Sequence, residues 1–171
     1  SITLEQIVGA FVRIGFEVEG VENPGKAIKG PLRIGRVLSI EGLTGLKKPI
    51  RYVGLDCGEK SVRFVICGAT NFQVGDLVVV AIPGSVLPGN FAITARETYG
   101  RTSNGMICSA RELGLGDDHN GIIVVRDSKA RVGDDALKTL KVDDPVIDIA
   151  VNPDRGYAMS IRGAARELAM A

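Results

Sequence analysis

The sequence predicts a mainly β protein in which a small closed barrel is inserted between two α/β flanks. Its 171 residues include 22 glycines and 7 prolines, which favour many turns. Several short strand-like segments follow one another between residues 31 and 140, at the spacing typical of a closed barrel. Helical apolar patterns occur near both ends. We therefore expect a discontinuous α/β domain of residues 1–30 and 141–171, and a barrel of residues 31–140.

The first flank begins with an amphipathic helix. Its apolar positions recur at helical spacing, and they are Leu4, Ile7, Val8, Phe11 and Ile14. Thr3 is a candidate N-cap, and Gly15 is a stop signal after the last apolar position. Residues 16–21 then alternate as a short strand. The Asn-Pro-Gly and Gly-Pro pairs of residues 22–31 mark the clearest boundary in the sequence.

Three strands are expected to open the barrel, at residues 33–41, 50–57 and 62–67. The segment 57–60 between the last two is a hairpin turn signal. Residues 76–82 form a continuous apolar run, which is typical of a strand buried on both faces.

The glycine-rich stretch 100–116 predicts a barrel edge rather than a helix, because each interior glycine costs a helix about 1 kcal/mol. Residues 91–99 and 105–109 are interpreted as two arms of one bent strand, and residues 121–125 as a further strand. Small β folds tend to carry their binding surface at such an edge. Met106 and Ile107 are expected in the core rather than at a contact.

The second flank is expected to hold a strand at residues 145–151 and a helix at residues 160–170, with Ser160 as its N-cap. The chain stops at Ala171 with no helix stop signal. We interpret it as a piece of a longer protein.

Composition places the chain among ordinary globular proteins, with 45% hydrophobic and 24% charged residues. No apolar run is long enough to span a membrane, and the start lacks a signal-peptide pattern, so an intracellular location is expected. The net charge of +1 is low for a domain built mainly to grip nucleic acid. Residues 31–140 carry 14 Lys and Arg against 11 Asp and Glu, a weak positive bias.

No catalytic or metal constellation is apparent. The three cysteines, Cys57, Cys67 and Cys108, are odd in number and widely spaced, so buried free thiols are expected. A structural zinc site would need about four ligands, and His119 is the one histidine. Asp117, Asp118 and His119 are interpreted as a polar loop rather than an acid/base or metal cluster. No phosphate-binding GxxxxGK[ST] motif occurs.

Four long stretches carry a more specific pattern. They are LRIGRVLSIE (32–41), VICGATNFQVGDLVVVAIPGSVLPG (65–89), GRTSNGMICSARELGLGDDHNGI (100–122) and NPDRGYAMSIRGAARELA (152–169). In this order they resemble the N-terminal region of the β chains of bacterial phenylalanine–tRNA ligases, and RIGFEVEGVE (13–22) fits the same region. LTGLKKPIR (43–51) and residues 156–159 resemble the actinobacterial version.

The resemblance implies that the barrel is an OB-fold tRNA-binding module inserted into a small α/β domain made by the two flanks. It implies an α2β2 enzyme of the cytoplasm that joins phenylalanine to tRNA(Phe) with ATP and Mg²⁺. The expected partners are tRNA(Phe), the α subunit and the remaining β-subunit domains, with no membrane. Aminoacylation would occur in the α chain, and editing and anticodon binding beyond residue 171. The fragment itself would then hold no catalytic site, metal or cofactor.

The position of the basic residues in this type of module favours a tRNA role, although each one taken singly fits a solvated surface better. The candidate nucleic-acid-binding residues are Lys47, Lys48, Arg51, Arg63, Arg96, Arg101, Ser103 and Asn104. Phe72 and Tyr99 are candidate stacking residues. Asn71 and Ser103 could equally bond local backbone in turns.

Two other functions stay open at this stage. The chain could be a structural module that docks the β chain onto its other domains or the α chain, which the apolar helix faces favour. These faces comprise Ile7, Phe11 and Ile14 in the first helix, and Ile161, Ala165 and Leu168 in the last. A free-standing OB-fold tRNA-binding protein is the third possibility, and the flanking helices argue against it.

Overall fold

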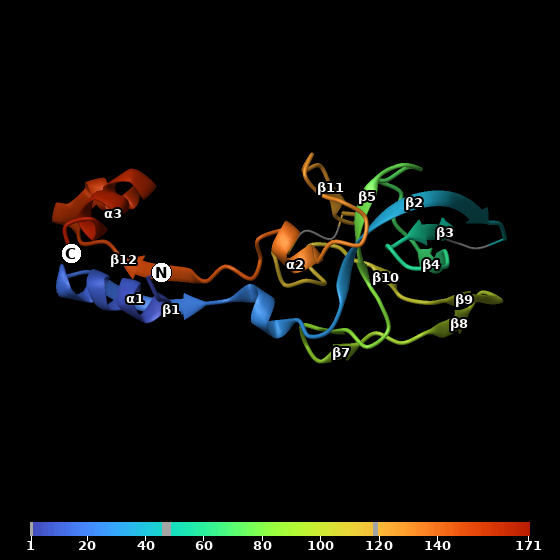
Figure 1. Ribbon diagram of the computed structural model, residues 1–171, viewed down its shortest axis with the longest axis horizontal. Helices are drawn as coiled ribbons and strands as arrows, with labels where there is room; N and C mark the ends of the chain where they lie inside the picture. Colours follow the sequence, from blue (N-terminus) through green and yellow to red (C-terminus); the bar gives the residue numbers. More distant parts are fainter. Residues whose placement is uncertain (1, 46–48, 118–119) are drawn as a thin grey trace. The chain divides into compact units, whose positions relative to one another are not determined.

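The computed structural model describes residues 2–45, 49–117 and 120–171, and it divides into two compact units (Figure 1). The smaller unit combines Ser1–Asn23 with Asp144–Ala171, and the larger unit comprises Pro24–Asp143. The larger unit is a barrel, and the predicted mainly β fold with α/β flanks is confirmed. The division between the units lies a few residues outside the expected boundaries of the barrel on each side.

Helix α1 (Leu4–Arg13) starts where its cap dictates. The Thr3 hydroxyl accepts from the backbone N–H of Gln6 at 3.3 Å, and the Gln6 side chain accepts from the Thr3 N–H at 2.9 Å. This capping box satisfies two N–H groups that a helix start leaves unpaired. Gly15, with φ of +84°, turns the chain after the helix, so the predicted start and stop signals both hold.

Two antiparallel strands and a second helix complete the smaller unit. Strand β1 (Glu17–Glu22) pairs with β12 (Val146–Ala150). The 3₁₀ segment η2 (Pro153–Met159) leads to helix α3 (Ile161–Leu168), capped by Ser160 as expected. The expected apolar face of α3 is only partly buried: Leu168 packs with Ala164 on the core of Phe11, Phe16 and Ala158, whereas Ile161 is 92% exposed and Ala165 is also exposed.

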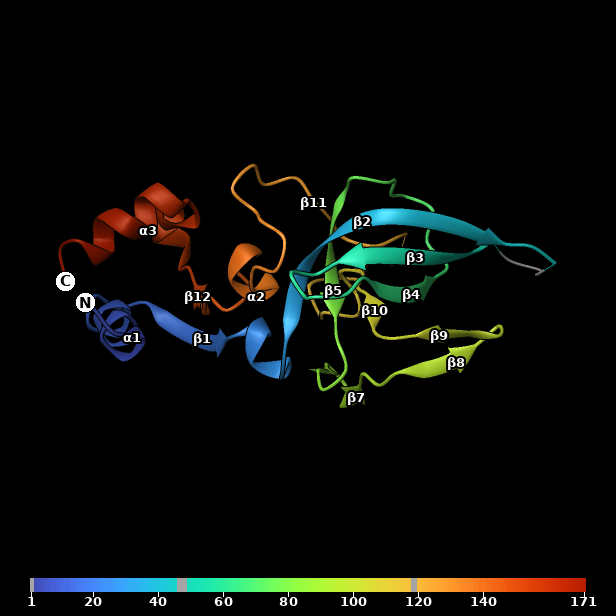
Figure 2. The ribbon, with the colours of Figure 1, turned by 45° about the vertical axis from the view of Figure 1, so that its right-hand side comes forward.

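The barrel consists of antiparallel strands in the order β10-β5-β2-β3-β4, with β11 also paired to β5 (Figures 1 and 2). The bounds of its strands are β2 (Leu32–Leu43), β3 (Ile50–Asp56), β4 (Arg63–Cys67), β5 (Leu77–Ala81), β10 (Met106–Ile107) and β11 (Val124–Val125). The long β2 pairs with β5 along its first half and with β3 along its second, and its register shifts between Val37 and Ser39. A bulge of this kind lets one strand bend around a barrel. The result is a partly open barrel of the OB-fold type.

The predicted burial of β5 on both faces is confirmed. Val78 and Val80 point into the barrel core beside Val53, Leu55 and Val65. Val79 and Ala81 point the other way, into a second apolar cluster. That second cluster also contains Ile34, Leu87, Cys108, Leu113 and Ala136. Strand β5 therefore packs against the barrel core on one face and against the second apolar cluster on the other.

The expectation of one bent strand over residues 91–109 is wrong. The segment divides into β7 (Phe91–Ala92), paired with β6 (Val86–Leu87), and a hairpin of β8 (Arg96–Thr98) and β9 (Arg101–Ser103), before β10 begins. Tyr99 and Gly100 both have positive φ, 55° and 70°, as a tight two-residue hairpin turn requires. Only Val124–Val125 of the strand expected at residues 121–125 forms β11.

Three further short elements carried no periodic signal. They are β6, the 3₁₀ segment η1 (Pro24–Ala27) and helix α2 (Ala136–Thr139). Asp135 caps α2 by accepting from the N–H of Leu137.

All three cysteines are free and buried, as expected. Burial raises the pKa of Cys57 to about 11 and that of Cys108 to about 12, and it also raises the pKa of Cys67. The thiolate is the reactive form of cysteine.

We predict that a thiol-specific reagent labels the native chain slowly between pH 7 and 9, because the folded thiols keep their protons over that range. In urea all three should react, and faster as the pH rises. Fast labelling of any cysteine before unfolding would contradict the buried arrangement.

Candidate nucleic-acid interface

The hairpin of β8 and β9 is joined to the free edge of β4 by hydrogen bonds. The Asn104 N–H donates to the Phe64 carbonyl at 2.8 Å, and the Ile66 N–H donates to the Ser103 hydroxyl oxygen at 2.9 Å. Gly105, with φ of +133°, follows at once, and a Cβ there would lie 2.7 Å from the Ala81 carbonyl oxygen. A side-chain hydroxyl thus takes the place of a ladder carbonyl, and β4 is connected to β10 through this short segment.

The Arg63 side chain also stabilises this junction between β4 and the β8–β9 hairpin. Its guanidinium makes two hydrogen bonds to the Glu59 carboxylate, at 2.7 and 2.9 Å, and a third to the Asn104 carbonyl at 2.6 Å. The Arg63 side chain is only 11% exposed. Of the sequence candidates, Arg63 and Ser103 therefore use their side chains to hold this junction, and Asn104 takes part through its backbone.

An aromatic surface lies on the outer face of β3 and β4, and we call it the β3–β4 platform (Tyr52, Phe64 and Arg101). The Tyr52 and Phe64 rings are stacked, with centroids 5.1 Å apart, and the Arg101 guanidinium lies 5.1 Å from the Tyr52 centroid. Arg101 also forms an ion pair with Glu41 at 2.7 Å. The Tyr52 hydroxyl donates to the Thr102 carbonyl, which ties the hairpin to the platform.

The remaining candidates are dispersed. Arg51 donates to the Phe72 carbonyl at 3.2 Å and lies over the Phe72 ring, which is buried and therefore not available for stacking on RNA. Arg96 is exposed and lies 5.5 Å from the Phe91 ring centroid. Tyr99 is exposed at the hairpin turn. Lys47 and Lys48 lie outside the described residues.

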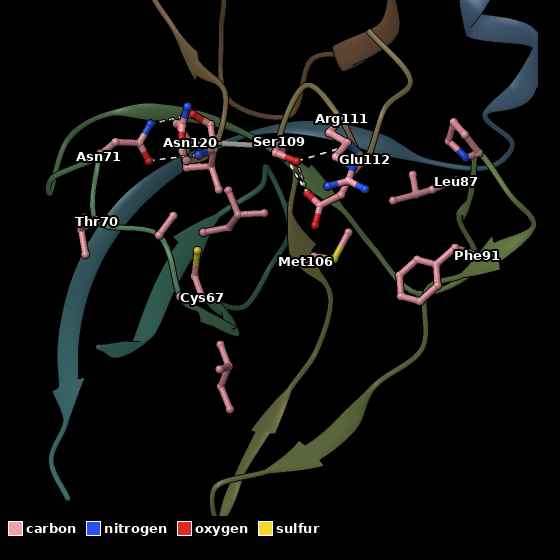
Figure 3. Close-up of a pocket in the computed structure, with 17 residues that line it drawn as sticks. Cys67, Thr70, Asn71, Leu87, Phe91, Met106, Ser109, Arg111, Glu112 and Asn120 are labelled. Atoms are coloured by element: carbon pink, nitrogen blue, oxygen red, sulfur yellow. Dashed lines mark hydrogen bonds between the residues drawn. The ribbon is translucent and has the colours of Figure 1, made fainter. Parts of the chain in front are cut away.

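A cleft of about 810 Å³ opens beside β4 and β10 (Figure 3). One part of its lining is apolar and includes Leu87, Phe91 and Met106. The other part is polar and comprises Asn71, Ser109, Arg111, Glu112 and Asn120, among others. This combination of an apolar surface with a few polar groups is typical of ligand sites.

Asn71 fixes one wall of the cleft. Its amide nitrogen donates to the Ile122 carbonyl at 2.8 Å, and its amide oxygen accepts from the Ile122 N–H at 3.0 Å. A Cβ on Gly121 would collide with the Asn71 side chain, so glycine is needed there. Asn71 is thus not a local turn residue, because its partner lies 51 positions along the chain.

Ser109 and Glu112 fix the opposite wall. The Ser109 N–H and hydroxyl both donate to Glu112 Oε2, at 2.6 and 2.8 Å, and the Glu112 N–H donates to the Ser109 hydroxyl oxygen. Figure 3 shows the Glu112 carboxylate pointing from Ser109 into the cleft, toward Met106. The Ser-x-x-Glu spacing is a capping-box signature that could have identified this turn from the sequence.

Two negative findings apply to the described part of the chain. No group of three or more His, Cys, Asp or Glu residues there could hold a metal ion, while Asp118 and His119 fall outside it. Within residues 2–45, 49–117 and 120–171, no helix is long and apolar enough to cross a membrane.

We predict that Asn71→Ala destabilises the wall of the cleft at Ile122. The substitution leaves the Ile122 N–H and carbonyl without their partner, so the free energy of unfolding should fall by about 1–3 kcal/mol. Urea unfolding measures the loss, and faster amide exchange at Ile122 locates it. Thr70→Ala, at the exposed neighbouring position, is the control and should change stability by less than about 0.5 kcal/mol. Equal stability of the two variants would show that the Asn71 bonds contribute nothing.

Known proteins match either the barrel unit alone or the whole chain. Residues 32–135, within the barrel unit, match the family described as "Putative tRNA binding domain". The whole chain is similar to proteins named phenylalanine--tRNA ligase beta subunit. It is 54% identical to that of Streptomyces avermitilis over 173 residues, with 99% of this chain and 21% of the relative covered. It is 58% identical to that of Mycolicibacterium paratuberculosis over 160 residues, with 94% and 19% covered.

The chain therefore spans about a fifth of the length of these relatives. Among solved structures, the CsaA chaperone protein from Picrophilus torridus matches with a TM-score of 0.45 and 10% identity, covering 61% of this chain and 88% of that one. Because the family model covers well over half of its residues, the chain belongs to the tRNA-binding-domain family.

Proposed function

We propose that the chain is the tRNA-binding N-terminal region of a phenylalanine–tRNA ligase β subunit. The observation that carries the proposal is the family match over residues 32–135, which lies within one folded unit, together with 54% identity over nearly the whole chain. In this proposal the complete enzyme works in the cytoplasm and joins phenylalanine to tRNA(Phe) with ATP and Mg²⁺. This region would contribute RNA contacts and no catalytic group.

The RNA contacts are assigned to exposed cations that lie next to aromatic or apolar surface. Arg96 beside Phe91, Arg101 on the β3–β4 platform and Arg111 at the cleft fit this description. Cations neutralise phosphates, while aromatic faces stack on bases. Lys47, Lys48 and Arg51 remain proposed contacts. We assign Arg63 and Ser103 to holding the β8–β9 hairpin, because their side chains already have internal partners, and Asn104 contributes its backbone N–H and carbonyl to the same junction.

We predict weak, salt-dependent binding of tRNA(Phe) by the isolated chain. Each phosphate contact contributes close to one unit to the slope of log K against log salt, so Arg96→Gln and Arg111→Gln should each weaken binding and flatten that slope by about one. Titration of labelled tRNA at several salt concentrations measures both quantities.

Arg166→Gln is the matched control for this titration. It removes one exposed positive charge from α3 in the smaller unit and should leave the slope unchanged. Binding that does not vary with salt, or no binding at millimolar protein, would overturn the tRNA proposal.

A second role is favoured by exposed apolar side chains in the smaller unit. Met159 is 82% exposed and Ile161 is 92% exposed, and Tyr157 nearby is also exposed. Neighbouring exposed apolar side chains mark interaction surfaces. We propose that this surface packs against the remaining β-subunit domains or the α subunit.

We predict that Met159→Ser with Ile161→Ser leaves the free energy of unfolding of this chain within about 0.5 kcal/mol of the parent, because neither side chain is buried in it. In the full-length β subunit, the same pair should reduce the yield of assembled heterotetramer on co-expression with the α subunit. Size-exclusion chromatography measures the yield. Full assembly of the double variant would exclude this surface as a contact needed for assembly with the α subunit.

A further inference from the structure

The cleft combines an apolar side with a carboxylate, and this pairing selects among the parts of an RNA. We propose that the cleft binds the base of one unpaired nucleotide, and that Glu112 selects bases carrying an exocyclic amino group. The inference rests on the proposed tRNA-binding function and names the part of the RNA that this site would take. The volume of the cleft, about 810 Å³, lies within the range of sites for small organic groups.

The charge inside the cleft argues for a base and against a phosphate. The Glu112 carboxylate projects into the cleft (Figure 3), and Arg111 lines the same cleft, so the two opposite charges leave a phosphate no net attraction there. Leu87, Phe91 and Met106 line the same cleft and would lose no hydrogen bonds against an aromatic ring. The exposed Arg96 and Arg111 are placed to meet the phosphates that flank the base.

Phe91 provides the stacking surface. Its side chain is 43% exposed, and it borders both the large cleft and a smaller cavity of about 180 Å³. Arg96 lines only the smaller cavity and lies over the ring at 5.5 Å. The ring is therefore supported on the Arg96 side and can receive a base on the side of the cleft. Proteins that bind single-stranded RNA use aromatic side chains in this way.

The hydrogen-bonding state of Glu112 gives the base preference. Oε2 already accepts from the N–H and the hydroxyl of Ser109, and the turn holds the carboxylate in place. The carboxylate can only accept, so the matching partner is a donor such as the N4 amino group of cytosine. Uracil presents a carbonyl oxygen at that position, and two acceptors facing each other repel. Cytosine should therefore bind more tightly than uracil, although the two rings have nearly the same size.

The experiment compares short oligocytidine and oligouridine RNAs, labelled at one end, by fluorescence anisotropy with the full chain. Oligocytidine should bind about tenfold more tightly, the amount expected for one hydrogen bond to a charged group. Glu112→Gln keeps an acceptor for the Ser109 N–H but also offers an amide donor, so the ratio of the two affinities should fall to about one. Phe91→Leu should weaken both RNAs about fivefold or more, because stacking does not depend on the base.

Glu19→Gln is the matched control. It removes one exposed negative charge from β1, outside the cleft, and should strengthen both RNAs equally without changing their ratio. Equal binding of the two RNAs by the parent chain, or a preference that survives Glu112→Gln, would overturn this inference while salt-dependent tRNA binding stands. Failure of both RNAs and of tRNA to bind would overturn the proposed function as well.

Discussion

The structure depends on how the free edge of β4 is satisfied. An open strand edge exposes N–H and carbonyl groups to unwanted pairing, and a barrel avoids this by closing on itself. Here closure is made by one backbone hydrogen bond from Asn104 and by the hydroxyl of Ser103 rather than by a regular ladder. The Arg63–Glu59 pair fixes the carbonyl side of the same junction. Because the β8–β9 hairpin is attached here, the positions of Arg96 and Arg101 depend on these contacts.

The shape of the cleft is likewise fixed by side-chain hydrogen bonds. Its polar residues lie mostly in loops between strands, and loops are in general more mobile than strands. In this chain the Asn71 amide bonds both backbone groups of Ile122, and Ser109 and Glu112 bond each other reciprocally. A site held in this way loses less conformational entropy on binding than a loose one. Rigid walls therefore support recognition of one group by shape, even where the total contact area is small.

The elements with a strong period could be predicted, and those made by distant contacts could not. Helix α1 and strands β2 to β5 carry their signals in adjacent residues, so their positions agree with the patterns. The segment 91–109 has no such period, and its division into β7, β8, β9 and β10 depends on which strand each piece meets. The candidate residues divide in the same way. The sequence shows that Arg and Ser side chains are suited to RNA contact. It does not show that Arg63 and Ser103 have internal partners, because these partners lie 41 and 37 positions away along the chain.

The low net charge has a consequence for how such a barrel can bind RNA. The net charge is only +1, and Arg101 on the β3–β4 platform is paired with Glu41, so we expect the barrel to attract phosphates only weakly. Electrostatic binding of this kind is weak and does not distinguish sequences. A surface with few phosphate contacts gains selectivity chiefly from groups that meet bases directly. In our proposal the Glu112 carboxylate is such a group, and Arg111 lines the same cleft. Under this proposal, weak attraction by exposed arginines and discrimination between bases by the cleft would complement each other.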